Sequence, residues 1–358
     1  MRYLRQHITT ILEIYNGSTP LANFLKQYFK QYPILGSRDR KTLSAMAYRW
    51  YRIGKGNEHS LHDTLAGWTS APESWIKAQN DPRPIDMNGS FPYDIALSAG
   101  ITKEEWLSSM LTQPDLFIRI RKDKNKIVHL LNEHNIAFTP ITETCLSLPN
   151  GAKIDAILPE DCYVVQDASS QQTGTFFQAK KNELWYDCCS GAGGKSLLLK
   201  DMEPAVRLAV SDVRESIIHN LQQRFRLYRH ELPTAYVTNV ADKQALNKPL
   251  CTKQFDNIIC DVPCSGSGTW ARTPEQFYFF KPADLDKFPP LQTAIATNVS
   301  SYLKPGGRLI YITCSVFKKE NEDVVSRIIN ETGLTLQSAQ IINGTSIRAD
   351  SMFVAIMS

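Results

Sequence analysis

Long apolar runs are missing from this 358-residue chain. No stretch of about 18 consecutive apolar residues occurs, which excludes a transmembrane helix. The first residues, MRYLRQHITTILEIYNG, lack the continuous apolar segment and small-residue cleavage site of a secretory signal, so we expect a soluble, cytoplasmic protein. Low-complexity tracts and internal repeats are also missing, and a hydrophobic share of 42% is too high for a disordered chain.

A strong excess of one charge is missing as well. The chain has 40 Lys and Arg against 36 Asp and Glu, which leaves a net charge of +4. This balance excludes a histone-like polycation. It does not exclude an enzyme of nucleic acids whose basic residues gather on one face.

Cysteine is present, but without the spacing of a metal site or a disulfide framework. No C-x-x-C pair and no Cys/His cluster with zinc spacing occurs, so we expect no metal. A disulfide framework is typical of small exported domains, which this chain does not resemble. We expect most of the eight cysteines to be small buried hydrophobic residues, with Cys264 and Cys314 as the exceptions. The other six are Cys145, Cys162, Cys188, Cys189, Cys251 and Cys260.

The length predicts two or three domains, at roughly 100–200 residues per domain. Residues 1–112 have helical periodicity, and residues 113–165 fit a small α+β module. Residues 166–358 alternate apolar runs with helical patterns, which is typical of an α/β fold with a mostly parallel sheet. The expected strands of that sheet are 183–187, 207–212, 235–239, 255–261 and 307–313.

A glycine-rich turn follows the first of these strands, which ends at Asp187. Glycines let the backbone approach a ligand, and the start of the next helix offers free N–H groups. Asp212 ends the second strand, where a carboxylate can accept both ribose hydroxyls. The spacing is neither the dinucleotide pattern nor the phosphate loop, so the sequence indicates a nucleoside cofactor without fixing which one; a turn without a ligand is the alternative. The residues of this candidate site are Cys189, Ser190, Gly191, Ala192, Gly193, Gly194, Lys195 and Asp212.

Two cysteines follow neighbouring strands at the same sheet edge. The fourth strand runs into Asp261-Val262-Pro263-Cys264-Ser265-Gly266, and the fifth into Thr313-Cys314-Ser315. A thiol near a helix N-terminus has a lowered pKa, and its thiolate is a competent nucleophile. The alternative for either cysteine alone is a buried thiol at a strand end. The pair, the glycine-rich turn and Asp212 together favour catalysis.

In their order along the chain, these segments resemble the RsmB/Sun family of RNA (cytosine-5)-methyltransferases, which use S-adenosylmethionine. The resemblance covers residues 166–358 and, more weakly, 113–165, and it implies a Rossmann-like methyltransferase domain. Departures are Ser190-Gly191-Ala192 in place of the family's Ala-Ala-Pro, and Ile217 in place of an arginine. The matching segments are Gln166–Gln171, Asp187–Ser196, Asp261–Gly266, Thr313–Ser315 with Glu320–Glu322, and Asp350–Ala355.

The resemblance implies a role for each candidate residue. Cys314 is the nucleophile that adds to C6 of cytosine, and Cys264 assists release of the methylated base. Asp261 contacts the N3/N4 edge of the base and the cofactor, and Lys195 supports the same base. Asn239 occupies the position where an acid approaches the adenine, with Asp242 three residues later as the other candidate.

RNA is the expected partner, and we expect the chain to act as a monomer on a flipped or single-stranded base. Two groups of basic residues are candidates for phosphate contacts; a solvated charged face, with the neighbouring aromatic side chains in the core, is the alternative for each. The first basic cluster is Arg38, Arg40, Lys41, Arg49, Arg52 and Lys55, interleaved with Tyr48, Trp50 and Tyr51. The second basic cluster is Arg119, Arg121, Lys122, Lys124 and Lys126. Tyr278, Phe279 and Phe280 fit base stacking or, more simply, core packing. The region before residue 113, with Asp39-Arg40 and Tyr48-Arg49, faintly resembles a NusB-like helical domain.

Ribosomal RNA of the 16S type is the expected substrate, and transfer RNA is the first alternative. A methyltransferase for a protein or a small molecule is a second alternative, because a fold alone does not fix a function. An RNA-binding assembly factor without activity is a third. Simple transfer to nitrogen or oxygen has no use for two thiols, so the pair Cys264 and Cys314 favours cytosine C5.

Overall fold

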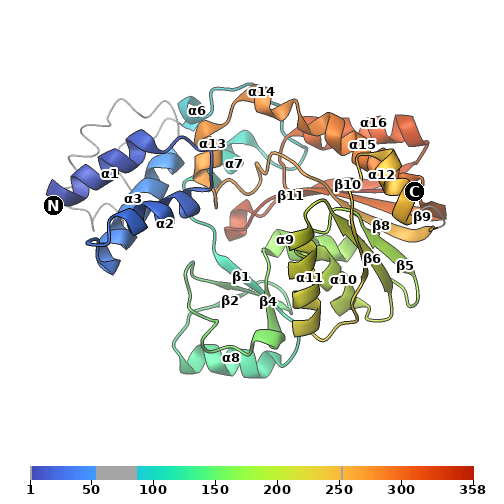
Figure 1. The fold of residues 1–358 in the computed structure, drawn as a ribbon, viewed down its shortest axis with the longest axis horizontal. Coiled ribbons are helices and arrows are strands. Elements are labelled where there is room, and N and C mark those ends of the chain that lie inside the picture. Colours follow the sequence, from blue (N-terminus) through green and yellow to red (C-terminus); the bar gives the residue numbers. More distant parts are fainter. Residues whose placement is uncertain (1, 54–86, 251–252) are drawn as a thin grey trace. The chain divides into compact units, whose positions relative to one another are not determined.

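The computed structural model describes residues 2–53, 87–250 and 253–358 (Figure 1). These residues form two compact units. Unit 1 contains the described residues of Met1–Ile95 together with Lys103–Gln113 and Thr269–Asp284, and unit 2 contains Ala96–Thr102, Pro114–Gly268 and Leu285–Ser358. Of the helices in these ranges, none has both the length and the apolar character that crossing a bilayer requires.

Unit 1 is helical. Its helices are α1 (Arg2–Ile14), α2 (Leu21–Gln31), α3 (Ser37–Ile53), α6 (Met87–Ser90), α7 (Lys103–Met110) and α13 (Pro274–Phe279), and α14 (Pro282–Leu285) begins in it. The apolar faces of the first three helices form one core around Ile11, Leu25 and Met46.

Residues 269–284 join the N-terminal helices, although the sequence prediction places them in 166–358. Tyr278 and Phe279 pack against the core of α1–α3, and Glu275 accepts a hydrogen bond from the backbone N–H of Leu21 at 3.0 Å. Phe280 is buried as well. These aromatic side chains therefore pack in a core, and the predicted boundaries near 112 and 165 stay predictions.

The small module is an antiparallel sheet with one helix. Its strands lie in the order β2-β3-β1-β4, and α8 (Lys124–Glu133) packs on them through Ile127 and Leu131. The pairing sets Ile118 opposite both Leu146 and Val165. The strands are β1 (Leu116–Ile120), β2 (Thr139–Pro140), β3 (Cys145–Leu148) and β4 (Tyr163–Val165).

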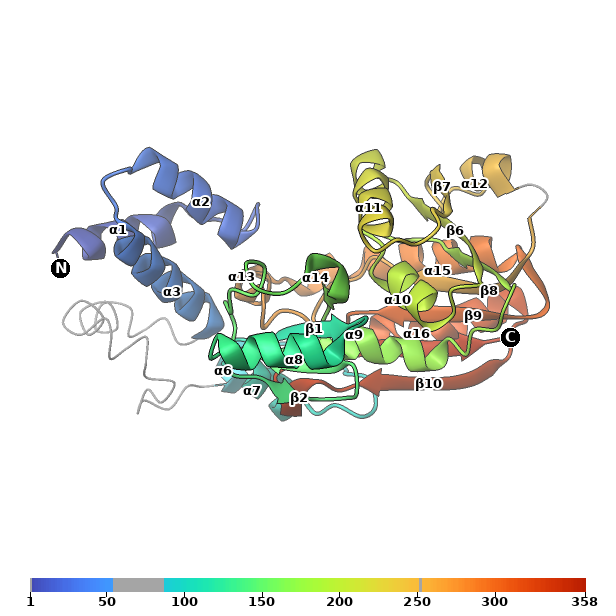
Figure 2. The ribbon, with the colours of Figure 1, turned by 90° about the horizontal axis from the view of Figure 1, so that it is seen from below.

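The large sheet of unit 2 has seven strands in the order β10-β11-β9-β8-β5-β6-β7. The five strands expected from the sequence are parallel to one another, and β11 and β10 add an antiparallel edge. Figure 2 shows β10 along this edge of the sheet. The fold is therefore the mostly parallel α/β sheet that the sequence predicts. The strands are β5 (Leu184–Asp187), β6 (Arg207–Asp212), β7 (Thr234–Val237), β8 (Phe255–Asp261), β9 (Leu303–Thr313), β10 (Leu336–Ile342) and β11 (Met352–Met357).

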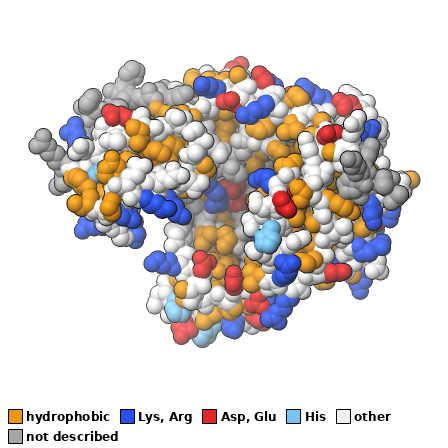
Figure 3. All heavy atoms as spheres, in the orientation of Figure 1, with side chains coloured by type: hydrophobic (Ala, Val, Ile, Leu, Met, Phe, Trp, Pro, Cys, Tyr) orange, Lys and Arg blue, Asp and Glu red, His pale blue; other side chains and the backbone are white. Residues whose placement is uncertain are grey.

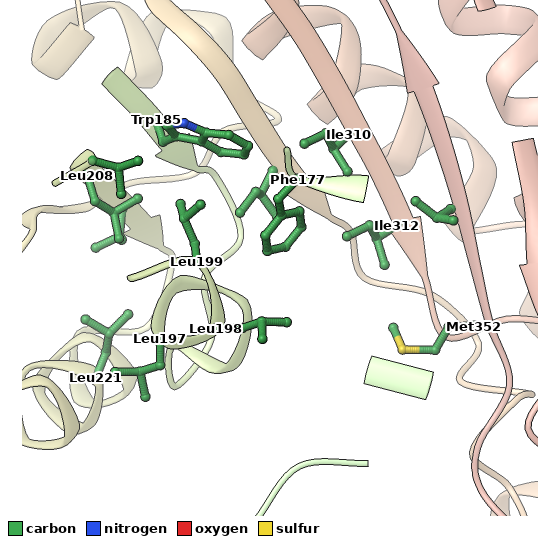
Figure 4. Close-up of a cluster of buried hydrophobic side chains, with 14 of the residues drawn as sticks. Phe177, Trp185, Leu197, Leu198, Leu199, Leu208, Leu221, Ile310, Ile312 and Met352 are labelled. Carbon is green, nitrogen blue, oxygen red and sulfur yellow. The ribbon is translucent and has the colours of Figure 1, made fainter. Parts of the chain in front are cut away.

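Helices cover both faces of this sheet (Figure 1). On one face, α10 and α11 pack on the strands through the cluster drawn in Figure 4, which contains Leu197 and Leu199 of α10, Leu221 of α11 and Trp185, Ile310 and Ile312 of the strands. On the other face, α15 and α16 pack on each other, and α15 contacts β8 and β9. The helices of unit 2 are α8 of the small module, α9 (Ala168–Gln172), α10 (Gly194–Met202), α11 (Glu215–Leu227), α12 (Lys243–Leu250), α15 (Phe288–Ser300) and α16 (Glu322–Thr332).

The carboxyl ends of the parallel strands meet at one edge. Asp187 of β5 lies opposite Val210 of β6 and Ile259 of β8, and Asp261 of β8 lies opposite Ile312 of β9. The strand order reverses between β5 and β8, and ligands of open α/β sheets bind at such a switch point.

Candidate active site

The glycine-rich turn after β5 is tied to the end of β6. The backbone N–H of Gly191 donates to Asp212 Oδ2 at 3.1 Å, and that of Ser190 donates to the Ser211 carbonyl at 2.9 Å. Gly193, at φ +82°, caps α10, which begins at Gly194, and a Cβ on Gly193 would lie 2.9 Å from Leu221 of α11. Only glycine fits a turn that adopts this conformation against a helix.

Helix α11 also fixes the turn from outside. Arg224 donates a hydrogen bond from Nη1 to the carbonyl oxygen of Ala192 at 2.6 Å. The backbone of the turn is thus held by both its strand and its neighbouring helix.

A pocket of about 440 Å³ lies at this sheet edge, beside the turn. Of the predicted cofactor residues, Cys189, Asp212, Asn239 and Asp261 line it. Asp242 does not line it, because its carboxylate caps α12 by accepting from the backbone N–H groups of Gln244 and Ala245. The other lining residues are Cys188, Val213, Arg214, Thr238, Val240, Val262, Pro263, Leu291 and Ile295.

Asp212 is buried and carries a dense set of hydrogen bonds. Arg214 donates to it from its backbone N–H and from Nε, both at 3.0 Å, and from Nη2 at 3.2 Å. Burial by itself raises the pKa of Asp212, but the donors of Arg214 and Gly191 outweigh it and lower the pKa. The carboxylate is therefore charged and ready to accept hydroxyl donors. No sequence motif identifies Arg214, which follows the strand in an irregular segment.

Asp187 is a site residue that the sequence prediction did not include. Its carboxyl group is fully buried; Oδ2 accepts from Ser196 Oγ at 2.6 Å, and Oδ1 has no hydrogen-bond partner among the described residues. Burial raises the pKa of Asp187 to about 7. An unpartnered carboxylate oxygen beside Lys195, Asp261 and Asp212 suits a donor that a ligand would bring.

Lys195 and Asp261 form a buried ion pair. Lys195 Nζ, on the first turn of α10, lies 2.9 Å from Asp261 Oδ2 at the end of β8. Burial works to lower the pKa of Lys195, but the charges of Asp261, Cys314 and Asp187 raise it overall. Lys195 is therefore a fixed positive charge close to Cys314.

The structure brings the two predicted cysteines into contact. Cys264 Sγ lies 3.2 Å from Cys314 Sγ, and both side chains are half-buried. The hydrogen bond to Cys314 and burial raise the pKa of Cys264 well above its usual value. Either sulfur can be the donor of this contact.

The other cysteines follow the simple expectation with one exception. Cys145, Cys162, Cys188 and Cys260 are buried, whereas Cys189 is half-buried and lines the pocket. Cys251 lies outside the described residues. Within those residues, no group of His, Cys, Asp and Glu has an arrangement that could hold a metal ion.

The residues of the first basic cluster differ in exposure: Arg52 is buried, whereas Arg38 and Lys41 are exposed. The interleaved Trp50 and Tyr51 are buried in the helical core, and Arg52 donates to the carbonyl oxygens of Met110 and Thr112. Arg40 donates to the Leu35 carbonyl, and Lys55 lies outside the described residues. The packing of these aromatic side chains agrees with the alternative that places them in the core beneath a charged face.

In the second basic cluster, the two arginines are buried and the three lysines are exposed. Arg119 and Arg121 are buried at the small sheet and both pair with Asp201 of α10, at 2.5 Å and 2.7 Å, while His230 lies 2.7 Å from the same carboxylate. The phosphate-binding role predicted for these two arginines is therefore wrong, because their charges are already neutralised inside the protein. Lys122, Lys124 and Lys126 are exposed. Figure 3 shows basic and acidic side chains interspersed on one face of the molecule.

A mostly parallel sheet with a glycine-rich turn and an acidic second-strand end is typical of Rossmann-like domains that bind a nucleoside cofactor, the class to which S-adenosylmethionine-dependent methyltransferases belong. Solved structures share this fold. The crystal structure of PH0851 aligns over 99% of this chain and 98% of its own, with a TM-score of 0.73 at 16% identity. NSun6 from Pyrococcus horikoshii, solved with SFG, aligns over 71% of this chain and 93% of its own, with a TM-score of 0.61 at 13% identity.

Within that class, the family model described as 16S rRNA methyltransferase RsmB/F matches residues 175–353, and the chain belongs to this family. Ribosomal RNA small subunit methyltransferase B of Shewanella oneidensis is 32% identical over 187 residues, which are 52% of this chain and 43% of that protein. The Escherichia coli protein of the same name is 26% identical over 239 residues, 64% of this chain and 55% of that protein. The chain thus spans about half the length of these relatives.

Proposed function

We propose that this chain transfers a methyl group from S-adenosylmethionine to C5 of a cytosine in ribosomal RNA of the 16S type. The observation that carries the proposal is the contact of Cys264 with Cys314 at 3.2 Å, beside the Lys195–Asp261 pair. Transfer to nitrogen or oxygen needs no such pair of thiols. The names of the relatives support ribosomal RNA as the substrate.

The residues around the pocket fit the cofactor. Asp212 offers a charged acceptor for the two ribose hydroxyls, and Asn239 lines the pocket where the base of a nucleoside belongs. Asp187 has a free carboxylate oxygen for a cationic group. When bound, S-adenosylmethionine supplies an electrophilic methyl group on a sulfonium centre.

Cys314 begins the proposed reaction. Its thiolate forms a bond from Sγ to C6 of cytosine, and the electrons of the C5–C6 double bond move toward C5, which then accepts the methyl group. Lys195, held by its ion pair with Asp261, places a positive charge near the reacting sulfur. Asp261 accepts a hydrogen bond from the N4 amino group of the base and holds it over Cys314.

Cys264 acts at the end of the proposed reaction. The proton on C5 must leave so that its electrons re-form the double bond and expel Cys314 as a thiolate. Cys264, whose Sγ lies against that of Cys314, donates its thiol proton to Cys314 Sγ as the bond to C6 breaks, and the Cys264 thiolate left behind takes the proton from C5. Removing Cys264 should therefore slow release and let the covalent intermediate accumulate.

Trapping this intermediate tests the proposal. We expect Cys264→Ala, incubated with cellular RNA and S-adenosylmethionine, to accumulate a covalent protein–RNA adduct that resists denaturing electrophoresis. Adding Cys314→Ala should abolish the adduct. Sequencing the trapped RNA then distinguishes ribosomal from transfer RNA. Normal cofactor binding without an adduct on any RNA would refute the nucleophile assignment.

The cofactor side has its own test, in the pH dependence of binding. The pKa of Asp187 is raised to about 7 by burial, so its carboxylate gains charge as the pH rises through 7. We expect the affinity for the cationic S-adenosylmethionine, measured by calorimetry, to strengthen between pH 6 and 8 by about tenfold, of the order that one neighbouring charge contributes. Asp187→Asn, which keeps an acceptor for Ser196, should remove this dependence. An unchanged dependence in the variant would assign it to another group.

A further inference from the structure

A fully buried carboxylate lies directly behind the two cysteines. Glu320, in the 3₁₀ turn Lys318–Glu320, is 0% exposed, and none of its contacts is with a cation in the described residues. Charged side chains this deeply buried need several donors. Glu320 has four of them, two on each oxygen.

The donors come from both cysteine motifs. Oε2 accepts from Ser265 Oγ and from Ser315 Oγ, each at 2.5 Å, and Oε1 accepts from the backbone N–H of Ser265 at 2.8 Å. Ser265 follows Cys264, and Ser315 follows Cys314. The repeated Cys-Ser pair therefore has a structural reason: each serine donates to the same carboxylate oxygen.

The fourth donor fixes the carboxylate from the helix below. Gln292 of α15 donates from Nε2 to Glu320 Oε1 at 3.1 Å and to the carbonyl of Pro263 at 2.9 Å. The Tyr311 hydroxyl also donates to the Glu320 backbone carbonyl at 2.7 Å. Glu320 is thus anchored to helix α15 through Gln292 and to β9, the strand that leads into the Cys314 motif, through Tyr311.

Backbone contacts at Gly268 also join the two cysteine motifs, with Ser351 as a third segment. The backbone N–H of Gly268 donates to the Cys314 carbonyl and that of Ser351 donates to the Gly268 carbonyl, both at 2.9 Å. A Cβ on Gly268 would lie 2.0 Å from the Ser351 carbonyl oxygen. Residues 262–268, the Cys264 loop, are therefore held at Gly268 against residues 314–317, the Cys314 loop, by backbone contacts. At Ser265 and Ser315 the two loops are joined by the side-chain hydrogen bonds to Glu320.

We propose that Glu320 is a positioning residue, which sets the distance between Cys264 and Cys314 by accepting hydrogen bonds from the serine that follows each cysteine. The catalytic part of this inference rests on the proposed function; the geometric part does not. The negative charge of Glu320 also contributes to the raised pKa of Cys264, which keeps that residue in its thiol form.

The test measures the geometry of the two thiols without RNA. In a glutathione redox buffer, the two thiols and glutathione disulfide exchange to give a Cys264–Cys314 disulfide and two glutathione molecules, and its fraction gives the effective concentration of one thiol at the other. We expect Glu320→Gln to lower this effective concentration about tenfold, the scale of coupling between groups of one hydrogen-bond network. Mass spectrometry of the linked peptides provides the measurement.

Variants of the serines separate position from charge. Ser265→Ala and Ser315→Ala each remove a donor without changing charge or leaving a large cavity. Each should lower the effective concentration in the wild-type background and change it by less than about twofold when Glu320→Gln is already present. Full-size effects of both serine variants in the Glu320→Gln background would overturn the proposal, as would an unchanged effective concentration in Glu320→Gln.

Catalysis supplies a second readout. Glu320→Gln should lower kcat about 10²-fold, the size of a misplacement of catalytic groups, and leave KM for S-adenosylmethionine within about twofold. Glu322→Gln is the matched control, because Glu322 accepts from Ser98 Oγ and the Ala99 N–H instead of the cysteine loops. If the wild type methylates no RNA while the disulfide measurement still responds to Glu320→Gln, the proposed function fails and the positioning role stands.

Discussion

Replacing Cys314 with serine should lower the rate of methyl transfer to RNA by at least about 10⁴-fold, the scale on which removal of a nucleophile acts. Serine has nearly the same shape, but a hydroxyl ionises far less readily than a thiol and is the weaker nucleophile. Lys195, whose charge interacts with Cys314, cannot compensate for this difference. The measurement is single-turnover transfer of labelled methyl groups from S-adenosylmethionine.

Cofactor affinity and a second cysteine variant provide the controls for this loss of activity. Cofactor affinity should stay within about twofold, because Cys314 does not line the pocket that holds Asp212 and Asn239. Cys162→Ser is the matched substitution: this thiol is buried in the small module, against the carboxylates of Asp123 and Asp161 that a hydroxyl also satisfies. It should keep wild-type activity. Substantial activity in Cys314→Ser would assign the covalent step to a different group.

Replacing Asp201 with asparagine should lower the free energy of unfolding by about 3–5 kcal/mol at pH 7, because it leaves two buried arginines without a counter-charge. Arg119 and Arg121 of β1 both pair with this carboxylate of α10, so the ion cluster fastens the small sheet to the large one within unit 2. Urea unfolding followed by circular dichroism measures the change. A loss well below 1 kcal/mol would mean that water or another acid takes over the pairing.

The same ion cluster predicts that the free energy of unfolding depends on pH. Burial works to raise the pKa of Asp201, but the hydrogen bonds from His230, Arg121 and Arg119 and the charge of Arg119 lower it overall. An acid with a lowered pKa adds stability above its unfolded value of about 3.9, and that stability is lost as the pH falls below this value. The difference between wild type and Asp201→Asn should therefore shrink from pH 7 to pH 3. Lys122→Ala, which breaks the exposed pair with Asp161, should leave the midpoint at pH 7 unchanged.

The sequence predicted the large sheet well because its central strands are buried on both faces. Apolar runs such as Ile258-Ile259-Cys260 carry a signal that needs no partner to be recognised. Strand β10 was not predicted, since residues 336–340 are exposed and its pattern resembles a loop. The grouping of α13 with the N-terminal helices was also out of reach, because it depends on contacts between residues such as Leu21 and Glu275 that lie far apart in the chain.

The residues of the candidate site also differ in how far the sequence could predict them. Residues that end strands, such as Asp212, Asp261 and Cys314, could be predicted because the carboxyl edge of a parallel sheet brings them together. Asp187 also ends a strand, but its free oxygen shows only in three dimensions. Arg119 and Arg121 had the composition of an RNA-binding stretch, and nothing local in the sequence indicates that Asp201, about 80 residues later, neutralises them.

The path of the chain through unit 1 has a practical consequence for dissecting this protein. Residues 269–284 leave the sheet after β8 and return before β9, and Tyr278 and Phe279 pack in the core of α1–α3. A fragment that starts at residue 114 would keep this segment while losing the helices that bury it. The exposed aromatic surface would favour aggregation, so a soluble fragment of the large sheet requires a short polar linker in place of 269–284.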